Sequence, residues 1–466
     1  MRIERVHLKN YRCFGTLSVD LHPQMTVLVA PNGQGKTSVL DAIKVALWPY
    51  VAGFDLGSTT NDVTSIQIDD VRREQVQSHE MEWRLPAEIK AMGQLQVRQL
   101  VLDGILKNPL PEPEGSMLDV AVTYHEDVPW QGVRYRESIK KGTKTKEPVI
   151  VGALNLNETA QVLEQRIFSG EQRTPDDLPM LGYYGTGRLW AQKKLTSAHE
   201  KADSETSSRT FAYRDCLDPA SSYKHFAQWY TRIFKSFRTA QIRNVEKRLP
   251  LDADVAYGLI APIKAIQLAT DAILGPHTGW RELEYSEEHE ELVLNHEQFG
   301  QLKVSQLSDG IRNMLALVGD IAYRCYKLNA HMGEAAPHRT QGVVLIDEVD
   351  MHLHPGWQQT VLTDLMAAFP KLQFIVTTHS PQVLTTVKRE NIRLLERDAE
   401  GAWRASLPQQ EIKGVESGVA LNDAMHVNPI PPVDEAGWLA DYTAMIEVGT
   451  HEEADGLALR QKLVAL

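Results

Sequence analysis

The sequence predicts an α/β fold built around a parallel sheet. Val27-Leu28-Val29 is a short apolar run without a polar face, as in a buried strand, and it leads into a glycine-containing loop at residues 30–37. Apolar residues then recur at helical spacing, at Val39, Leu40, Ile43, Ala46 and Leu47. Residues 343–346 and 372–377 are two more apolar runs of strand length. Buried strands combined with a strand, loop and helix in this order are typical of an α/β domain.

The composition is that of an ordinary soluble globular protein. Of the 466 residues, 42% are hydrophobic and 24% are charged, and this length favours about two to four domains. We find no apolar run long enough to span a bilayer, and the N-terminus lacks the apolar stretch of a signal peptide. Three cysteines without metal-binding spacing (Cys13, Cys216 and Cys325) indicate free thiols in a reducing cytoplasm. The net charge of −12 argues against a surface that coats nucleic acid indiscriminately.

The loop has the residues of a phosphate-binding P-loop, Ala-Pro-Asn-Gly-Gln-Gly-Lys-Thr. Its glycines let the backbone turn tightly, so that successive N–H groups and the positive end of the next helix point at a phosphate. Lys36 would reach the β- and γ-phosphates, and the hydroxyl of Thr37 would bind Mg²⁺. Ala30 departs from the general pattern, which has Gly at its first position. The predicted ATP-binding residues are Asn32, Gly33, Gly35, Lys36, Thr37 and Ser38.

Two later strands end in residues that would complete a nucleotide site. The run at 343–346 ends at Asp347 and Glu348, at the carboxyl end of a predicted parallel strand, where ligands of α/β sheets bind. Asp347 would hold the hydrated Mg²⁺, and Glu348 would orient or deprotonate the attacking water. His379 follows the strand at 372–377 and would contact the γ-phosphate. The alternatives are an ordinary acidic strand end and a structural histidine.

A third candidate element is Leu307-Ser308-Asp309-Gly310, which opens a predicted helix. Ser308 is a candidate N-cap, and the helix would offer a positive end and a hydroxyl group to a phosphate. The alternative is a plain helix cap that does not contact phosphate.

Together, these segments resemble the ABC-type ATPases, in particular the SMC/RecF/Rad50/OLD branch. Residues 308–310 are similar to the ABC signature, Asp350 to the D-loop aspartate and His379 to the switch histidine. The resemblance implies ATP and Mg²⁺ as cofactors, and an ATPase head with a RecA-like parallel-sheet lobe and an antiparallel β lobe. It also implies a head-to-tail dimer, in which the signature acts in trans on ATP bound to the other subunit. Ile311 departs from transporter-type signatures, which carry Gln.

Three stretches are more specifically similar to the PtuA family, the ATPase subunits of Septu-type anti-phage systems, including those carried with retrons. They are residues 3–14, 178–190 and 307–316, and the resemblance extends over most of the chain. It implies a PtuB-like HNH endonuclease as partner. In a retron, it also implies a reverse transcriptase with its msDNA and non-coding RNA.

We expect four segments along the chain. Residues 1–155 would form the N-terminal part of the ATPase head, and residues 276–395 its C-terminal part. Residues 156–275 would be a mainly helical insertion, without the sustained heptads of a long coiled-coil arm. Residues 396–466 would be a small helical tail that docks a partner.

Residues 223–248 predict an insertion helix with two different faces. Its apolar stripe at helical spacing indicates core, and consists of Tyr223, Phe226, Tyr230, Phe234 and Phe237. The other side carries Arg232, Lys235 and Arg238, whereas Glu246 is the single acid of the segment. This basic side is either a solvated face or a contact with nucleic acid or an acidic partner. Arg188, after a Gly-Thr-Gly sequence, is another candidate, either for a phosphate contact or for an ion pair in the core.

The C-terminal segment is too small to hold a nuclease domain. Residues 381–466 contain no Asp-x-Asp metal pair, and helical patterns occupy 434–447 and 451–465. A nuclease would therefore have to be supplied in trans. The leading hypothesis is a cytoplasmic ATPase subunit, without a membrane partner, that dimerises over ATP and controls an HNH nuclease in anti-phage defence. The alternative is a RecF-like DNA-repair ATPase that loads onto DNA without a nuclease partner.

Overall fold

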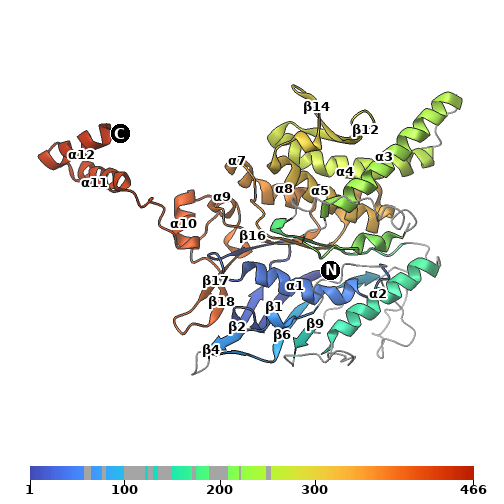
Figure 1. Cartoon of the computed structure of the whole chain (residues 1–466), viewed down its shortest axis with the longest axis horizontal. Helices are drawn as coiled ribbons and strands as arrows, with labels where there is room; N and C mark the ends of the chain where they lie inside the picture. The colour runs from blue at the N-terminus through green and yellow to red at the C-terminus, as the bar shows by residue number, and fades with distance from the viewer. Residues whose placement is uncertain are drawn as a thin grey trace, which may run out of the picture.

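The structure is a computed structural model. It describes residues 1–56, 65–75, 80–98, 121–123, 130–134, 150–169, 175–187, 208–219, 222–247 and 253–465. The candidate Arg188 lies outside the described residues. Figure 1 shows two sheets with a layer of helices above them, and a helical hairpin near the C-terminus that stands apart from the rest.

A parallel sheet forms the centre of the fold. Among the described residues it has six strands, in the order β11 (Met180–Tyr184), β15 (Gly342–Ile346), β16 (Leu372–Thr377), β3 (Met25–Val29), β17 (Ile392–Arg397) and β18 (Trp403–Ser406). Neighbouring strands are parallel except β17 and β18. Every residue of β3, β11, β15 and β16 is buried, as expected of parallel strands covered on both faces. The predicted α/β class with a parallel sheet is confirmed.

A second sheet, which is antiparallel, is built from the N-terminal third of the chain. Its order among the described residues is β10 (Ile150–Val151), β9 (Trp130–Arg134), β6 (Ala87–Gln94), β1 (Arg2–Tyr11) and β2 (Phe14–Asp20). Val6 pairs with Val19 and Leu8 with Leu17, so the register buries the alternating apolar residues of both strands on one face. Short elements extend this region: η1 (Ile68–Asp70), β4 (Arg73–Gln75), β5 (Met81–Trp83), β7 (Gln96–Arg98) and β8 (Ala121–Thr123).

Helix α1 (Lys36–Val51) contacts both β6 and β16, so it lies between the two sheets, and α2 (Gly152–Ser169) packs on it. Gln373 of β16 joins the sheets directly. Its side chain accepts a hydrogen bond from the Ile3 N–H at 2.8 Å and donates one to the Ile3 carbonyl at 2.7 Å. The buried amide therefore continues the edge of β1 and fixes the antiparallel sheet against the parallel one.

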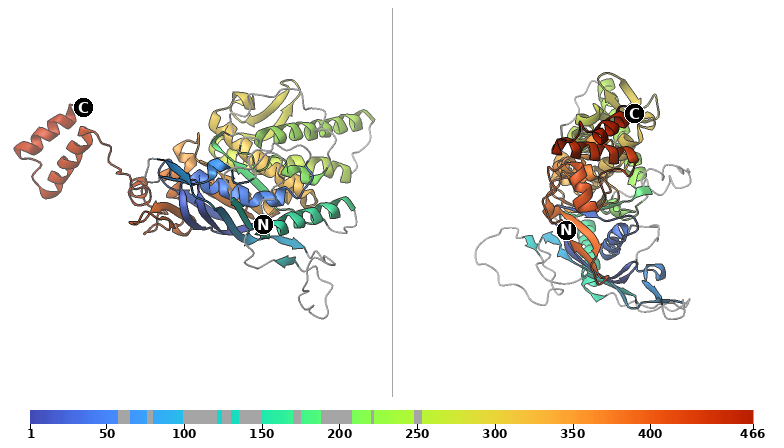
Figure 2. Two further views of the ribbon diagram at one scale, coloured as in Figure 1. Left: turned by 60° about the horizontal axis from the view of Figure 1, so that its bottom comes forward. Right: turned by 90° about the vertical axis from the view of Figure 1, so that its left-hand side faces the viewer.

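The helical layer contains α3 (Ser222–Lys247), α4 (Ala253–Thr278) and α5 (Asp309–Leu328), which Figure 1 labels and Figure 2 shows from two other sides. The short elements η4 (Arg209–Tyr213), η6 (Ala330–Ala335) and α6 (Ala336–Arg339) pack against α5. Phe226, Tyr230 and Phe234 of α3 are buried, as the apolar stripe predicted. A small sheet of β12 (Arg281–Ser286), β13 (Glu291–His296) and β14 (Gly300–Lys303) follows α4, and η5 (Val304–Gln306) leads to α5. Short helices surround the parallel sheet: α7 (Pro355–Gln358), α8 (Val361–Ala368), α9 (Pro381–Leu384) and η7 (Arg389–Asn391).

Segment boundaries differ from the prediction at two places. β11 falls within residues 156–275, the predicted insertion, but it pairs with β15 and belongs to the central sheet. The predicted tail, residues 396–466, likewise begins inside this sheet, because β18 pairs with β17. Both strands are short, and their sequences alone do not indicate a sheet. Pairing with β15, which is distant in sequence, places β11 in the central sheet, and pairing with β17 across a turn places β18 there.

The prediction that no segment is apolar and long enough to span a membrane was wrong for α4. Val255–Thr278 passes that test by length and composition. However, 61% of its most apolar window is buried within the fold, against α5, η6 and α8. α4 is therefore hydrophobic because it is a core helix.

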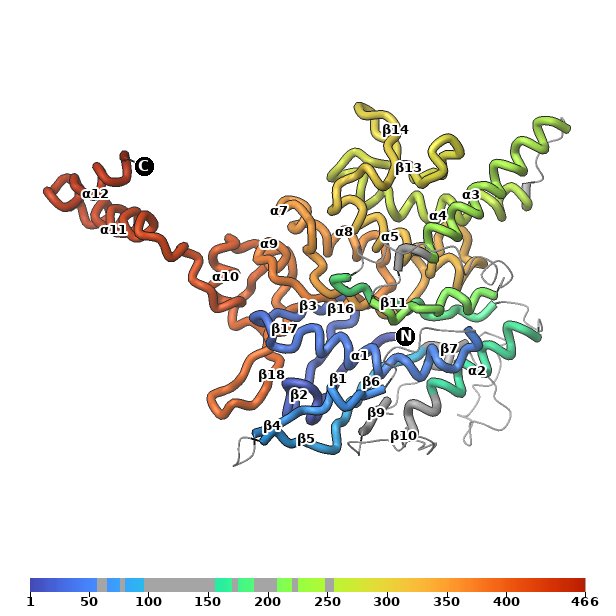
Figure 3. The backbone as a smooth tube through the Cα atoms, viewed as in Figure 1, coloured from blue at the N-terminus to red at the C-terminus, as the bar shows by residue number. Residues whose placement is uncertain are grey.

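Beyond β18 the chain leaves the sheet through α10 (Ser417–Met425), which packs on α9. The backbone trace in Figure 3 then runs to α11 (Asp434–Val448) and α12 (Ala454–Val464), which pack on each other away from the sheets. The two helices match the predicted patterns closely, but none of the residues of α11 is buried. We call these two helices the C-terminal hairpin.

Candidate nucleotide-binding site

The P-loop connects β3 to α1 in a conformation suited to an anion. Gly33 and Gly35 adopt positive φ angles of 76° and 87°, where side-chain-bearing residues are strained. A Cβ atom on Gly35 would also collide with the ring of Phe14. α1 begins with Lys-Thr-Ser-Val, which includes no acid, and its described N-terminus has no side-chain cap. The N–H groups of this first turn therefore remain available for a phosphate.

Lys36 is buried at the start of α1, with only 7% of its surface exposed. Its ammonium donates hydrogen bonds to the carbonyls of Ala30 at 2.7 Å and Pro31 at 3.3 Å. Burial lowers the pKa of Lys36, and Asp347 and Glu348 act in the opposite direction. Lys36 thus lies in the field of the predicted acidic pair, although it is more than 300 residues away in sequence.

Asp347 connects the two halves of the site. The hydroxyl of Thr37 donates to Asp347 Oδ2 at 2.9 Å, across 310 residues of sequence. Asp347 Oδ1 accepts a hydrogen bond from the Thr377 hydroxyl at 2.6 Å, and that hydroxyl accepts one from the Glu348 N–H at 2.8 Å. This contact forms because β15, β16 and β3 are adjacent in the sheet and end at the same edge. Thr377 is not among the predicted site residues, and its position just before Thr378-His379 is the signal in the sequence that points to it.

Glu348 has an unusual backbone conformation. It is half-buried and has φ of 50°, a region that few residues other than glycine adopt. Such local strain is found most often at functional sites, where the surrounding structure holds it in place. Asp350, two residues later, accepts a hydrogen bond from the Thr378 hydroxyl at 2.5 Å. Residues 347–350, which we call the acidic turn, are therefore bonded to the segment that carries His379.

His379 is half-buried at the end of β16. Burial lowers its pKa and the positive charge of Lys36 lowers it further, whereas Glu348, Asp350 and Asp347 oppose the shift. A lowered pKa favours the neutral ring, which can donate one hydrogen bond without carrying a charge. Its electrostatic neighbours are the predicted residues of the P-loop and the acidic turn.

The signature-like segment lies at the start of α5. Ser308 occupies the N-cap position with an extended backbone and is exposed, but its side chain makes no capping hydrogen bond. A Cβ atom on Gly310 would lie 2.6 Å from the His352 carbonyl. This glycine therefore permits close packing of α5 against the segment that follows the acidic turn. Asn313 also donates to the Met351 carbonyl at 3.0 Å. Among the described residues, no hydrogen bond joins Ser308, Asp309 or Gly310 to the P-loop of the same chain.

A polar cluster beside the P-loop was not predicted. Arg12, in the turn between β1 and β2, pairs with Asp41 of α1 at 2.6 Å and with Asp70 at 2.8 Å. Tyr183 of β11 donates to Asp41 at 3.0 Å. The cluster ties α1 to the antiparallel sheet on one side and to the parallel sheet on the other. The side chains of Arg232, Lys235 and Arg238 belong instead to the exposed face of α3.

Comparison with known protein families agrees with this geometry. The family described as "AAA domain" matches residues 5–249, more than half of the chain. The chain belongs to this family. A second description, "AAA domain, putative AbiEii toxin, Type IV TA system", matches residues 194–385. Membership of this family makes the protein an ATPase. Weaker or shorter similarities extend to an OLD nuclease, 22% identical over 88% of this chain, and to a Rad50 ATPase and a RecF protein over 10% and 9% of this chain.

Individual proteins similar to this chain include a retron ATPase, a Septu protein and an SMC head. The "Retron Ec83 probable ATPase" of Escherichia coli is 25% identical over 93% of this chain and 78% of its own length. The "Septu protein PtuA" of Bacillus mycoides (strain KBAB4) is 38% identical over 24% of this chain and 16% of its own length. A solved SMC head bound to the C-terminal winged-helix domain of ScpA aligns with a TM-score of 0.44 and 16% identity, over 87% of this chain and 98% of the other.

Proposed function

We propose that this ATPase is a subunit of an anti-phage defence complex of Septu or retron type, in which it dimerises over ATP and controls a partner HNH nuclease. The hydrogen bond between Thr37 and Asp347 carries the enzymatic part of this proposal, because it joins the P-loop to the acidic strand end in one site. The defence role is supported by the similarity to retron and Septu proteins.

The described residues fit ATP together with Mg²⁺. The uncapped first turn of α1 and the ammonium of Lys36 would hold the phosphates. The hydroxyl of Thr37 and the carboxylate of Asp347 are hard oxygen donors, which Mg²⁺ prefers. When bound, Mg²⁺ would neutralise charge on the phosphate oxygens. Glu348 would take a proton from water, and neutral His379 would donate a hydrogen bond to the terminal phosphate.

The dimer is proposed because the signature is exposed and is not bonded to its own P-loop. Ser308 has a hydroxyl that makes no capping bond, at the positive end of a helix of 20 residues. In a head-to-tail dimer it would contact ATP held by the partner, with Asp309 and Gly310 beside it. Light scattering tests this: with ATP, the Glu348→Gln variant should double its mass, and adding Ser308→Arg should prevent the change. A monomeric Glu348→Gln variant in saturating ATP would contradict the dimer.

The C-terminal hairpin is the proposed docking site for the HNH nuclease. It exposes apolar side chains, including Leu439 at 57% and Ile446 at 48% exposed, and contributes little to the core. The test is co-expression with an HNH protein encoded by an adjacent gene, and co-purification on a tag. Leu439→Ser with Ile446→Ser should abolish co-purification. Val255→Ser, which removes another exposed apolar side chain on α4, should leave it unchanged.

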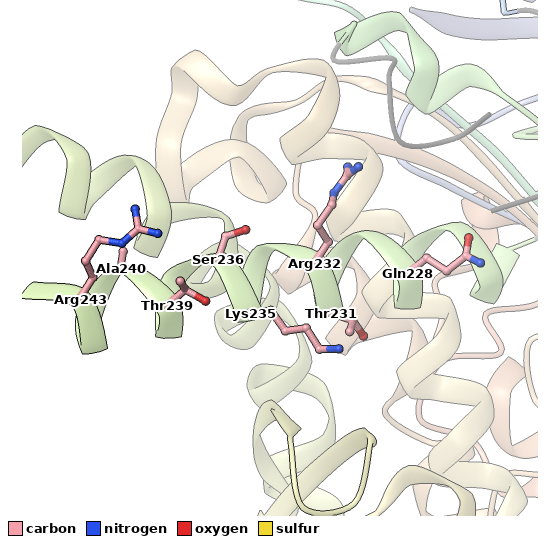
Figure 4. Close-up of a pocket in the computed structure, with 8 residues that line it drawn as sticks. All are labelled: Gln228, Thr231, Arg232, Lys235, Ser236, Thr239, Ala240 and Arg243. Atoms are coloured by element: carbon pink, nitrogen blue, oxygen red, sulfur yellow. The ribbon is translucent and has the colours of Figure 1, made fainter. Parts of the chain in front are cut away.

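The basic face of α3 is the proposed contact with DNA. In a retron, this DNA would include the msDNA. Figure 4 shows the face, lined by Gln228, Thr231, Arg232, Lys235, Ser236, Thr239, Ala240 and Arg243. Arg238 lies beside it, over the ring of Phe234. No ion pair between these cations and a carboxylate is found in the described part of the chain. Cations without acidic partners, accompanied by hydroxyl groups, suit a phosphate backbone.

Charge reversal tests this contact. Arg232→Glu with Lys235→Glu should weaken binding to single- and double-stranded DNA of mixed sequence at least about tenfold and flatten its salt dependence. Lys388→Glu, at an exposed lysine outside α3, is the control. If the protein binds DNA through α3 but no HNH protein co-purifies with it, the RecF-like alternative, an ATPase that loads onto DNA, is favoured.

A further inference from the structure

Two consecutive tyrosines on β11 reach opposite sides of the parallel sheet. The hydroxyl of Tyr183 donates to Asp41 of α1 at 3.0 Å, and the hydroxyl of Tyr184 donates to Asp320 of α5 at 2.8 Å. Successive side chains of a strand point to opposite faces, so one strand contacts both helices. α1 begins at Lys36 in the P-loop, and α5 follows directly after Ser308. β11 therefore links the P-loop helix to the signature helix through one side-chain hydrogen bond on each of its faces.

The backbone of β11 also reaches the acidic turn. The Tyr184 carbonyl accepts a hydrogen bond from the Asp347 N–H at 2.8 Å. On its other side, β11 has no strand neighbour in the described sheet and is bonded to residues 216–219 instead, through Tyr183 N–H and Gly185 N–H. An edge strand with one strand partner can shift with fewer broken bonds than a central strand. β11 therefore contacts α1, α5 and the acidic turn, and it lies at the edge of the described sheet, where a strand can shift more easily than in the centre.

The contact with α5 is buried and incompletely bonded. Asp320, Arg324 and Tyr184 are each at most 2% exposed. Arg324 Nε donates to Asp320 Oδ2 at 2.7 Å, the same oxygen that Tyr184 uses. Asp320 Oδ1 is buried but has no hydrogen-bond partner in the described structure. A guanidinium can engage both oxygens of a carboxylate, so a second arrangement of this pair would satisfy the orphaned atom.

We propose that Tyr183 and Tyr184 are positioning residues that transmit the state of the P-loop through β11 to α5, and so set the position of Ser308. The inference rests on the proposed function, in which Ser308 acts on ATP of the partner subunit. Movement of α1 on ATP binding displaces Asp41, the Tyr183 hydroxyl follows it, and the shift of β11 alters the bond between Tyr184 and Asp320. Because a helix moves as a rigid body, a displacement of α5 at Asp320 also displaces its N-terminus beside Ser308.

Hydrogen exchange of α5 tests this proposal in the full-length chain. The measurement uses the Ser308→Arg background, because the large side chain blocks the contact with the partner's ATP, and any change in α5 must then come through its own chain. ATP should slow exchange of the amides of α5 by about threefold or more. Adding Tyr184→Phe should remove this response, while the Kd for a fluorescent ATP analogue stays within about twofold. Tyr183→Phe tests the other end of the path and remains informative if Tyr184→Phe does not fold.

Tyr230→Phe is the matched control. Tyr230 is also buried, and its hydroxyl donates to the Leu283 carbonyl at 2.6 Å, so the variant loses one buried hydrogen bond outside the path. It should retain the response of α5 to ATP. An ATP-bound Ser308→Arg chain whose α5 exchanges at the unliganded rate would overturn the proposal, as would an undiminished response in both tyrosine variants. Failure of the wild-type chain to bind ATP would be seen first, in the titration, and would refute the proposed function itself.

Discussion

The strands that carry the ATP site and the C-terminal hairpin differ in the burial of their apolar residues. β3, β15 and β16 are buried along their whole length and place Thr37, Asp347 and His379 at one edge of the sheet. The hairpin also has many apolar residues, yet α11 buries none and α12 buries only Gly456 among its described residues. The apolar strands of the first region are covered by their own chain. The second presents a surface that another protein can complete.

The largest effect is expected at the centre of the site. Lys36→Ala removes the buried ammonium that is proposed to hold the phosphates, so affinity for ATP should fall at least about 100-fold, a change of roughly 3 kcal/mol in binding. Titration with a fluorescent ATP analogue measures this. The control is Lys44→Ala, a lysine in the same helix but outside the loop. Unchanged affinity in the Lys36→Ala variant would refute the P-loop assignment.

The second effect separates binding from chemistry. Glu348→Gln retains the shape of the side chain but removes the proposed base, so turnover should fall about 100-fold or more while ATP still binds. Steady-state phosphate release and the ATP titration, made on one preparation, give both quantities. If Glu348→Gln hydrolyses ATP at the wild-type rate, another group is the base.

The third prediction compares stability in the two regions. Ile375→Ala in β16 removes a fully buried side chain and should lower the free energy of unfolding by about 2–5 kcal/mol. Val448→Ala in the hairpin, where the side chain is 78% exposed, should change it by less than about 0.5 kcal/mol. Urea unfolding followed by far-UV circular dichroism measures both. A loss at Val448 as large as that at Ile375 would mean that the hairpin is part of the folded core.

The smallest effect is expected on the ATPase when the hairpin is altered. Leu439→Ser with Ile446→Ser changes exposed residues far from the P-loop, so turnover in the absence of a partner should stay within about twofold of the wild type. Phosphate release by the purified chain checks this. A tenfold loss would show that the hairpin acts on the site directly, and the division into an ATP site that does not depend on the hairpin and a separate docking surface would be wrong.

Sequence patterns predicted the elements of the site well because each has a strong local signal. A buried run followed by a glycine loop fixes β3 and α1, and an apolar run ending in two acids fixes β15, whatever the rest of the chain does. The polar residues that support the site have no such signal. Thr377, Arg12 and Asp41 are ordinary in sequence, and their contacts depend on which strands and helices become neighbours.

The same limit explains the errors in segment boundaries. β11 was assigned to the insertion because its five residues do not reveal their partner, and parallel pairing with β15 joins residues far apart in sequence. The hydrophobicity of α4 reflects burial against α5 and α8, which only the tertiary structure shows. Composition alone cannot distinguish a core helix from a membrane span.

The central claim is that one active site uses the P-loop of one subunit and the signature of another, and mixing two inactive variants tests it most directly. Lys36→Ala should lack ATP binding, and Ser308→Arg should bind ATP without turnover. In a mixed dimer, one of the two sites combines an intact P-loop with an intact signature, so an equimolar mixture should recover about a quarter of wild-type turnover. A mixture as inactive as its two components, although the chains exchange, would contradict the account.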